Sequence, residues 1–141
     1  MAEKIKLDSV DRQILHDLQD HGRMTNVDLA KNAGISAPPC LRRVRALEDA
    51  GIIKGYHADI DSDALGYSVQ VFAFVGLTSQ AETDLRDFET LVSTWPQVRE
   101  CHMLMGETDF LLKIVAHDWD DFQKFLTSKL TSAKNVSHVK T

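Results

Sequence analysis

One stretch constrains the fold of this chain more than any other: residues 25–55, which read TNVDLAKNAGISAPPCLRRVRALEDAGIIKG. It opens with a short helical pattern whose small and apolar side chains can face a core: Val27, Leu29, Ala30 and Ala33. Gly34 is expected to end this helix, because glycine adopts left-handed backbone angles at less cost than other residues. An arginine-rich helical pattern follows at once, so the stretch predicts two helices that meet at a tight corner.

The second helix is expected to begin at about Ala37. Ser36 is a favoured N-cap residue, and Pro38 and Pro39 fall in the first turn, where a missing N–H does least harm. At about 100° per residue, one side of this helix carries Cys40, Leu41, Val44, Leu47 and Glu48. The opposite side carries Pro38, Pro39, Arg42 and Ala46, with Arg43 and Arg45 at its flanks. The exposed face is therefore predicted to be small and basic.

A small, basic helix face suits the major groove of DNA. This groove is roughly 12 Å wide, and arginine side chains can reach phosphates or the paired acceptors of guanine. A solvated surface helix would show the same arginines, so the neighbouring segments matter. Residues 8–20 predict a preceding helix with Asp8 as its cap, Gly22 at its end and a buried stripe of Val10, Ile14, Leu15 and Leu18. Residues 52–60 resemble a strand pair, or wing.

Together these segments predict a winged helix-turn-helix that binds double-stranded DNA. The residues expected to contact DNA lie at the start of the first helix of the motif, along the exposed face of the second and in the wing: Thr25, Asn26, Ser36, Ala37, Pro38, Pro39, Arg42, Arg43, Arg45 and Lys54. The net charge of −5 arises in the second half, because residues 1–60 hold 9 Lys and Arg against 9 Asp and Glu, while residues 61–141 hold 7 against 12. With so few basic residues a monomer would bind phosphates weakly, so a dimer is expected.

The second half alternates between strand and helix patterns. Strands are predicted at residues 68–78, 98–105 and 110–116 and from Val136 onward, with helices at residues 82–94 and after Asp118. The second of these helices carries the apolar stripe Trp119, Phe122, Phe125, Leu126 and Leu130. The order βαββαβ predicts a ferredoxin-like antiparallel sheet with both helices on one face. The chain as a whole is thus predicted to have an α+β fold, with domains at residues 1–60 and 68–141 and a hinge at about residues 58–67.

The first predicted strand is apolar on both faces. One face carries Val69, Val71, Ala73, Val75 and Leu77, while Phe72 and Phe74 point the other way. Helices on one side of the sheet would leave the phenylalanines exposed, and an exposed apolar patch usually marks an interface. A homodimer through this sheet face is expected, the alternative being an open face with scattered apolar residues.

Two stretches resemble the Lrp/AsnC family of transcriptional regulators: LDSVDRQILHDLQDHGRMTNVDLAKNAGISAPPCLRRVRALEDAGIIKGY and ECHMLMGETDFLLKIV. The resemblance implies a winged helix-turn-helix domain joined to a regulation-of-amino-acid-metabolism (RAM) domain that binds the effector and mediates oligomerisation. It further implies a homodimer that assembles into an octamer, amino-acid effectors bound in clefts between dimers, and no cofactor.

The resemblance places the effector near the turn at residues 106–109. The residues implied are Met103, Gly106, Glu107, Thr108, Asp109 and Trp119. A tight turn can present free backbone N–H groups to an α-carboxylate, and the Asp109 carboxylate is expected to take the α-ammonium. Without the resemblance this segment would be interpreted as a routine hairpin turn.

Enzyme alternatives are weaker on the residues. Glu100, His102, Glu107 and Asp109 could form a catalytic or metal cluster, but no nucleophile or ligand triplet accompanies them, and Cys40 and Cys101 lack metal-ligand spacing. Some tetrapyrrole decarboxylases of haem biosynthesis are similar in architecture, and a nucleoid-type architectural DNA-binding protein would share the fold. With no apolar run of about 18 residues and no signal peptide, the protein is expected to be cytoplasmic, without a membrane partner.

Overall fold

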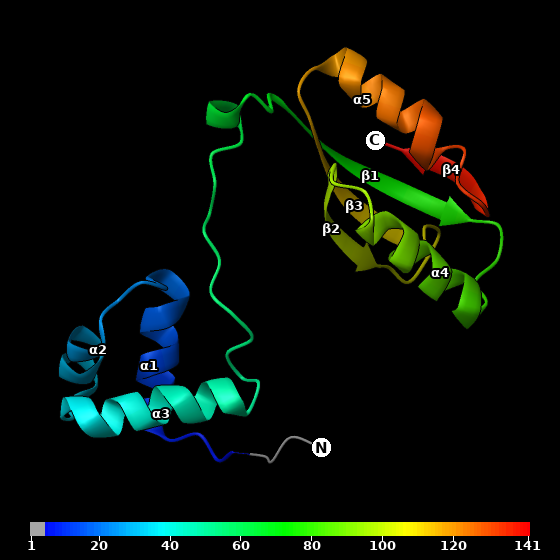
Figure 1. Ribbon diagram of the computed structural model, residues 1–141. Helices are drawn as coiled ribbons and strands as arrows, with labels where there is room; N and C mark the ends of the chain where they lie inside the picture. The colour runs from blue at the N-terminus through cyan, green and yellow to red at the C-terminus, as the bar shows by residue number, and fades with distance from the viewer. Residues whose placement is uncertain (1–4) are drawn as a thin grey trace. The chain divides into compact units, whose positions relative to one another are not determined.

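The computed structural model describes residues 5–141. Residues 1–4 lie outside the described residues. They belong to the N-terminal segment in which no signal peptide is predicted. The chain forms two compact units, the first ending at Asp59 and the second beginning at Ile60 (Figure 1). Each unit has its own hydrophobic core. No helix among residues 5–141 combines the length and apolarity needed to cross a membrane.

Three helices build the first unit: α1 (Ser9–Asp20), α2 (Asn26–Ala33) and α3 (Ala37–Asp49). They pack against one another around a buried centre formed by Ile14, Leu29, Ala30, Cys40 and Leu47 (Figure 1). The prediction that Val27 faces this core is wrong, because its side chain is 67% exposed. Val27 precedes Leu29 by two residues, which places it about 200° around the helix from that buried side chain.

Most helix ends follow the predicted caps. Asp8 caps α1, and Gly34 ends α2 in the left-handed conformation at φ 72°. Gly22 does not end α1: the helix stops at Asp20, and the His21 N–H completes the last turn by donating to the Asp17 carbonyl oxygen at 2.8 Å. That bond closes the turn without a left-handed residue, so glycine is not required there.

The strand pair predicted at residues 52–60 is absent, since no residue of this segment lies in a strand. Apolar and β-branched residues favour a strand, but a strand forms only where another strand supplies hydrogen-bonding partners. All strand pairings in residues 5–141 belong to the sheet of the second unit. The segment instead continues from α3 as irregular chain.

The second unit contains β1 (Val69–Leu77), α4 (Glu82–Ser93), β2 (Val98–Met103), β3 (Phe110–Ala116), α5 (Trp119–Phe125) and β4 (Val136–Lys140). A short 3₁₀ helix (Asp63–Leu65) precedes β1, and a π-helical turn (Leu126–Leu130) extends α5. The four strands form one antiparallel sheet in the order β2-β3-β1-β4. This confirms the predicted βαββαβ arrangement and the α+β fold.

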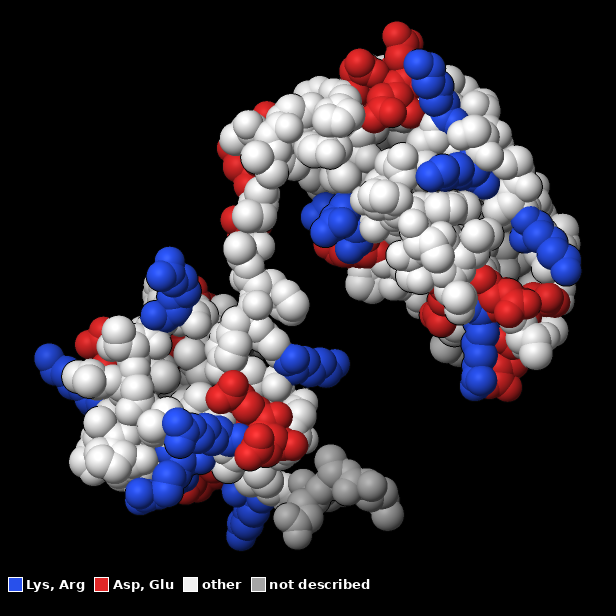
Figure 2. Space-filling view, in the orientation of Figure 1, with Lys and Arg blue, Asp and Glu red and all other residues white. Residues whose placement is uncertain are grey.

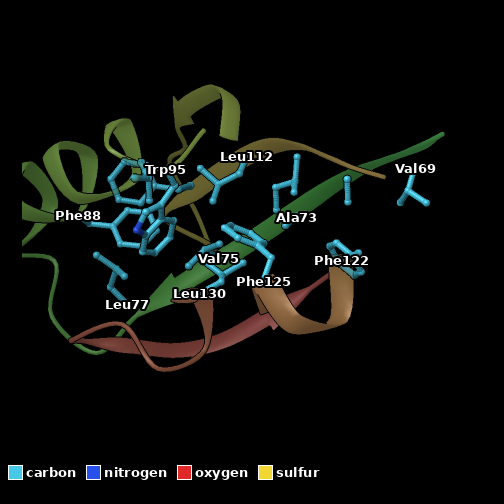
Figure 3. Close-up of a cluster of buried hydrophobic side chains, with 14 residues drawn as sticks. Val69, Ala73, Val75, Leu77, Phe88, Trp95, Leu112, Phe122, Phe125 and Leu130 are labelled. Carbon is cyan, nitrogen blue, oxygen red and sulfur yellow. The ribbon is translucent and has the colours of Figure 1, made fainter. Parts of the chain in front are cut away.

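The core of the second unit lies between the sheet and its helices. Val69, Ala73, Val75 and Leu77 of β1 are buried on this side together with Phe88 and Val92 of α4 and Phe122 and Phe125 of α5 (Figure 3). Trp119 does not join them, contrary to the predicted stripe, and is 67% exposed. It is the first residue of α5, where its ring makes a T-shaped contact with Phe122 at 6.0 Å between centroids.

The other side of the sheet is open. Phe72 is 49% and Phe74 40% exposed, as the alternation of β1 predicts. In the neighbouring strands, Phe74 pairs with Leu111 on one side and Lys140 on the other. We call the surface formed by Phe72, Phe74, Leu111 and Lys113 the open face. Within residues 5–141 no helix covers it.

The chain entering β1 is fixed to the second unit. The Tyr67 ring stacks on the His117 ring at 4.2 Å between centroids, and the Ser68 hydroxyl donates to the His117 carbonyl oxygen at 2.8 Å. The Gly66 carbonyl oxygen also lies 3.1 Å from His117 Nδ1. These contacts set the start of the second unit's sheet.

Candidate DNA-binding and effector-binding sites

The surface of α3 carries the predicted basic residues. Arg42 and Arg45 are exposed, as are Pro38 and Ala46 on the same helix and Lys54 beyond its end. Figure 2 shows basic side chains on the visible face of the first unit beside acidic ones. One copy of this unit therefore offers DNA a basic surface of modest size.

The start of α3 is held by α2. Asn26 Nδ2 donates to the Ala37 carbonyl oxygen at 2.8 Å, and Asn26 Oδ1 is buried. The amide therefore joins the two helices of the motif, and the predicted DNA contact by Asn26 stays a prediction. Thr25 caps α2 through its hydroxyl oxygen, which accepts from the Asp28 N–H at 3.2 Å. Ser36 occupies the N-cap position of α3, but its exposed side chain makes no capping hydrogen bond.

Arg43 is engaged within the protein. Its Nη1 lies 2.7 Å from Asp8 Oδ2 and 3.0 Å from Asp11 Oδ1, and both aspartates belong to the start of α1. The guanidinium therefore faces α1 through Nη1 while the side chain stays 35% exposed, and the predicted DNA contact by Arg43 stays a prediction. A helical wheel places Arg43 at a flank but cannot reveal a partner that is 35 residues away in sequence.

The turn between β2 and β3 is open to solvent. Gly106 has φ 134°, a conformation that favours glycine, and Gly106 and Glu107 are exposed while Thr108 is half-buried. The N–H groups of residues 106–108 make no backbone hydrogen bond to the part of the chain that the structure describes. Such free N–H groups are suited to bind a carboxylate.

Asp109, which follows this open turn, is buried: it is 9% exposed. Its Oδ2 accepts a hydrogen bond from the Leu77 N–H at 2.6 Å and lies 3.4 Å from Gln80 Nε2. The Asp109 N–H also donates to the Val75 carbonyl oxygen at 2.9 Å. The carboxylate therefore fastens the turn to the end of β1, and the expected contact with an α-ammonium stays a prediction. The sequence motif singled out Asp109 but did not indicate that its carboxylate accepts a hydrogen bond from Leu77.

The other two predicted effector residues differ in their distance from the turn. Met103 ends β2 beside it and is 52% exposed. Trp119 follows the far end of β3, a strand of seven residues that spans about 20 Å. One copy of the chain therefore does not bring Trp119 to the turn.

Strand β2 carries the other polar groups considered for catalysis. Glu100 lies 3.1 Å from His102 Nε2 and 3.4 Å from Lys113 Nζ, and these hydrogen bonds, that of His102 first, lower the pKa of Glu100. Cys101 borders a groove of about 260 Å³ between α4 and β2, where burial and then the charge of Glu89 raise the pKa of the thiol to about 11. A thiol with this pKa stays protonated at neutral pH and is a poor nucleophile. Among residues 5–141 no cluster of His, Cys, Asp and Glu is suited to hold a metal.

Comparisons with known proteins assign both units. Residues 7–54 match the family described as winged helix-turn-helix DNA-binding, and residues 70–141 match the Lrp/AsnC ligand binding domain. A DNA-binding motif followed by a ligand-binding domain defines a transcriptional regulator that responds to a small-molecule effector. The chain belongs to the Lrp/AsnC family.

The similar proteins carry names of regulators. The chain is 50% identical to the leucine-responsive regulatory protein of Rhizobium meliloti over 141 residues, covering 100% of this chain and 90% of the relative. It is 40% identical to the Bkd operon transcriptional regulator of Pseudomonas aeruginosa, covering 99% and 90%. The crystal structure of a Neisseria meningitidis transcriptional regulator in complex with L-methionine is similar with a TM-score of 0.88, at 38% identity over 96% of this chain and 87% of that one. These names favour a regulator over the decarboxylase alternative.

Proposed function

We propose that this protein is an amino-acid-responsive transcriptional regulator and not an enzyme. Residues 1–60 bind double-stranded DNA through α3, and residues 68–141 bind the effector and join copies of the chain. Two copies associate through the open face into a homodimer, and dimers assemble into an octamer. The protein acts in the cytoplasm.

The observation that carries the effector proposal is the set of free N–H groups at residues 106–108 within a ligand-binding domain. These groups bind the α-carboxylate of an amino acid, while Asp109 holds the turn in place from the protein side. Met103 and, from a second copy, Trp119 supply apolar surface for the effector side chain. A relative named for its response to leucine and a similar structure in complex with L-methionine support an amino acid as the effector.

Thermal shift against each of the twenty amino acids tests this proposal. A ligand that binds only the folded state raises the melting temperature, by an amount that grows with its concentration relative to Kd. We expect one or a few amino acids to raise the melting temperature. The same amino acids should change the affinity for DNA in a gel-shift assay. That assay compares two duplexes: one enriched by the wild-type protein from a random pool, and a shuffled duplex of the same composition. If no amino acid shifts the melting temperature, the effector proposal is wrong.

Arg42→Ala tests the recognition helix. Arg42 lies at the middle of the exposed face of α3, so its removal should cost roughly 1–3 kcal/mol of binding to the enriched duplex and relax discrimination at one position of the site. Arg45→Ala is the matched control: it should weaken binding to both duplexes alike. Arg42→Ala protein that binds the enriched duplex as tightly as wild type would remove Arg42 from base recognition. Equal affinity of the wild type for both duplexes would instead indicate the nucleoid-type alternative.

A further inference from the structure

Arg43 differs from the other arginines of α3 because its guanidinium has partners in another helix. Nη1 lies 2.8 Å from Asp8 Oδ1, 2.7 Å from Asp8 Oδ2 and 3.0 Å from Asp11 Oδ1. The Arg43 side chain is 35% exposed and that of Asp11 only 10%. Arg42 and Arg45 make no ion pair with any of residues 5–141.

The two carboxylates are themselves fixed. Asp8 and Asp11 form the capping box of α1, in which the Asp11 N–H donates to Asp8 Oδ1 at 2.9 Å and the Asp8 N–H donates to Asp11 Oδ2 at 3.2 Å. The box therefore holds both carboxylates beside the guanidinium through hydrogen bonds of their own. All of these contacts are made by one nitrogen, Nη1, which lies one bond beyond the position that a lysine ammonium would reach.

We propose that Arg43 is a positioning residue: its contacts with Asp8 and Asp11 fix the rotation of α3 about its own axis, and so determine where Arg42 meets the base edges. This inference rests on the proposed role of α3 as the DNA-reading helix. Base recognition is sensitive to such a rotation because hydrogen bonds weaken steeply as the distance lengthens and the angle departs from linearity. The charges agree with the geometry, since the hydrogen bonds with Asp8 and then Asp11 raise the pKa of Arg43.

Removing the carboxylates gives the first test. In Asp8→Asn/Asp11→Asn protein the side-chain carbonyl oxygens can still accept the capping N–H bonds, so α1 should persist, as circular dichroism will check. The variant is more positive than the wild type by two charges, and electrostatics alone would raise its affinity for all DNA. We expect instead that the ratio of affinities for the enriched and shuffled duplexes falls about tenfold, comparable to the removal of one side chain that reads a base. An unchanged ratio would overturn the proposal.

Arg43→Lys gives the second test, with Arg45→Lys as its matched control. Lysine keeps the charge that binds a phosphate but lacks the planar guanidinium. We expect Arg43→Lys to lower the affinity ratio about tenfold, as Arg43→Ala does, while Arg45→Lys keeps the wild-type ratio. The slope of log affinity against log salt should stay unchanged in Arg43→Ala. Arg45→Ala should make that negative slope shallower by about 0.9, because one phosphate is no longer neutralised by the protein.

The opposite pattern identifies a different role for Arg43. Suppose that Arg43→Lys keeps the wild-type affinity ratio and that Arg43→Ala makes the negative salt slope shallower by about 0.9. Arg43 then binds a phosphate and the proposal is wrong. Failure of the underlying function gives a separate result: Arg42→Ala would then also leave the ratio unchanged, which overturns the role of α3 and that of Arg43 with it.

Discussion

Replacing Phe74 by aspartate will convert the proposed dimer into folded monomers. Phe74 lies in the middle of the open face and is 40% exposed in a single copy, so the new carboxylate remains hydrated in the monomer and the second unit should fold. In the proposed dimer the same carboxylate is removed from water once in each copy, beside Lys140 of the neighbouring strand. Taking a charge out of water costs several kcal/mol and a nearby cation offsets only part of it, so the dimer Kd should rise by about a hundredfold or more.

Sedimentation velocity over a range of protein concentrations measures this change. Phe74→Leu retains an apolar side chain and should keep the wild-type oligomer. Thr90→Asp introduces the same charge at an exposed position of α4 and controls for charge alone. Phe74→Asp protein that keeps the wild-type oligomer at every concentration would show that copies do not associate through the open face.

Asp109→Ala and Asp109→Asn should differ sharply. Alanine leaves the buried Leu77 N–H without its 2.6 Å acceptor, which should lower the free energy of unfolding by roughly 1–3 kcal/mol. It also frees the turn at residues 106–108, so affinity for the effector should fall about tenfold, which corresponds to about 1.4 kcal/mol. Asparagine retains a carbonyl oxygen in the same place and should keep both properties close to those of the wild type.

Chemical unfolding and calorimetric titration with the amino acid found by thermal shift measure the two quantities. One result would contradict this prediction: Asp109→Asn protein has normal stability, but its affinity for the effector has fallen about ten- to a hundredfold. Removal of a charge-assisted hydrogen bond has this magnitude, so that result would place the carboxylate on the effector ammonium.

The sequence predicted most of the fold because local rules decide most of it. The period of apolar residues separates strands from helices, and single residues mark the ends: Asp8 caps α1, Asp118 caps α5 and Gly34 ends α2. The order of elements then selects the ferredoxin-like sheet. The strand predicted at residues 52–60 failed because composition does not supply a hydrogen-bonding partner.

For the functional sites, the sequence and the tertiary structure supplied different information. Sequence alone selected Asn26, Arg43 and Asp109 as functional residues, and the structure leaves each with a polar partner far along the chain: Ala37, the Asp8 and Asp11 pair, and Leu77. Arg42 and Arg45, which make no such contacts in residues 5–141, stay as predicted on the exposed face of α3. The sequence therefore determined which residues carry polar chemistry and on which element they stand. Only the tertiary structure decided which of them face solvent and which face another part of the protein, because that choice depends on contacts between segments that are distant in sequence.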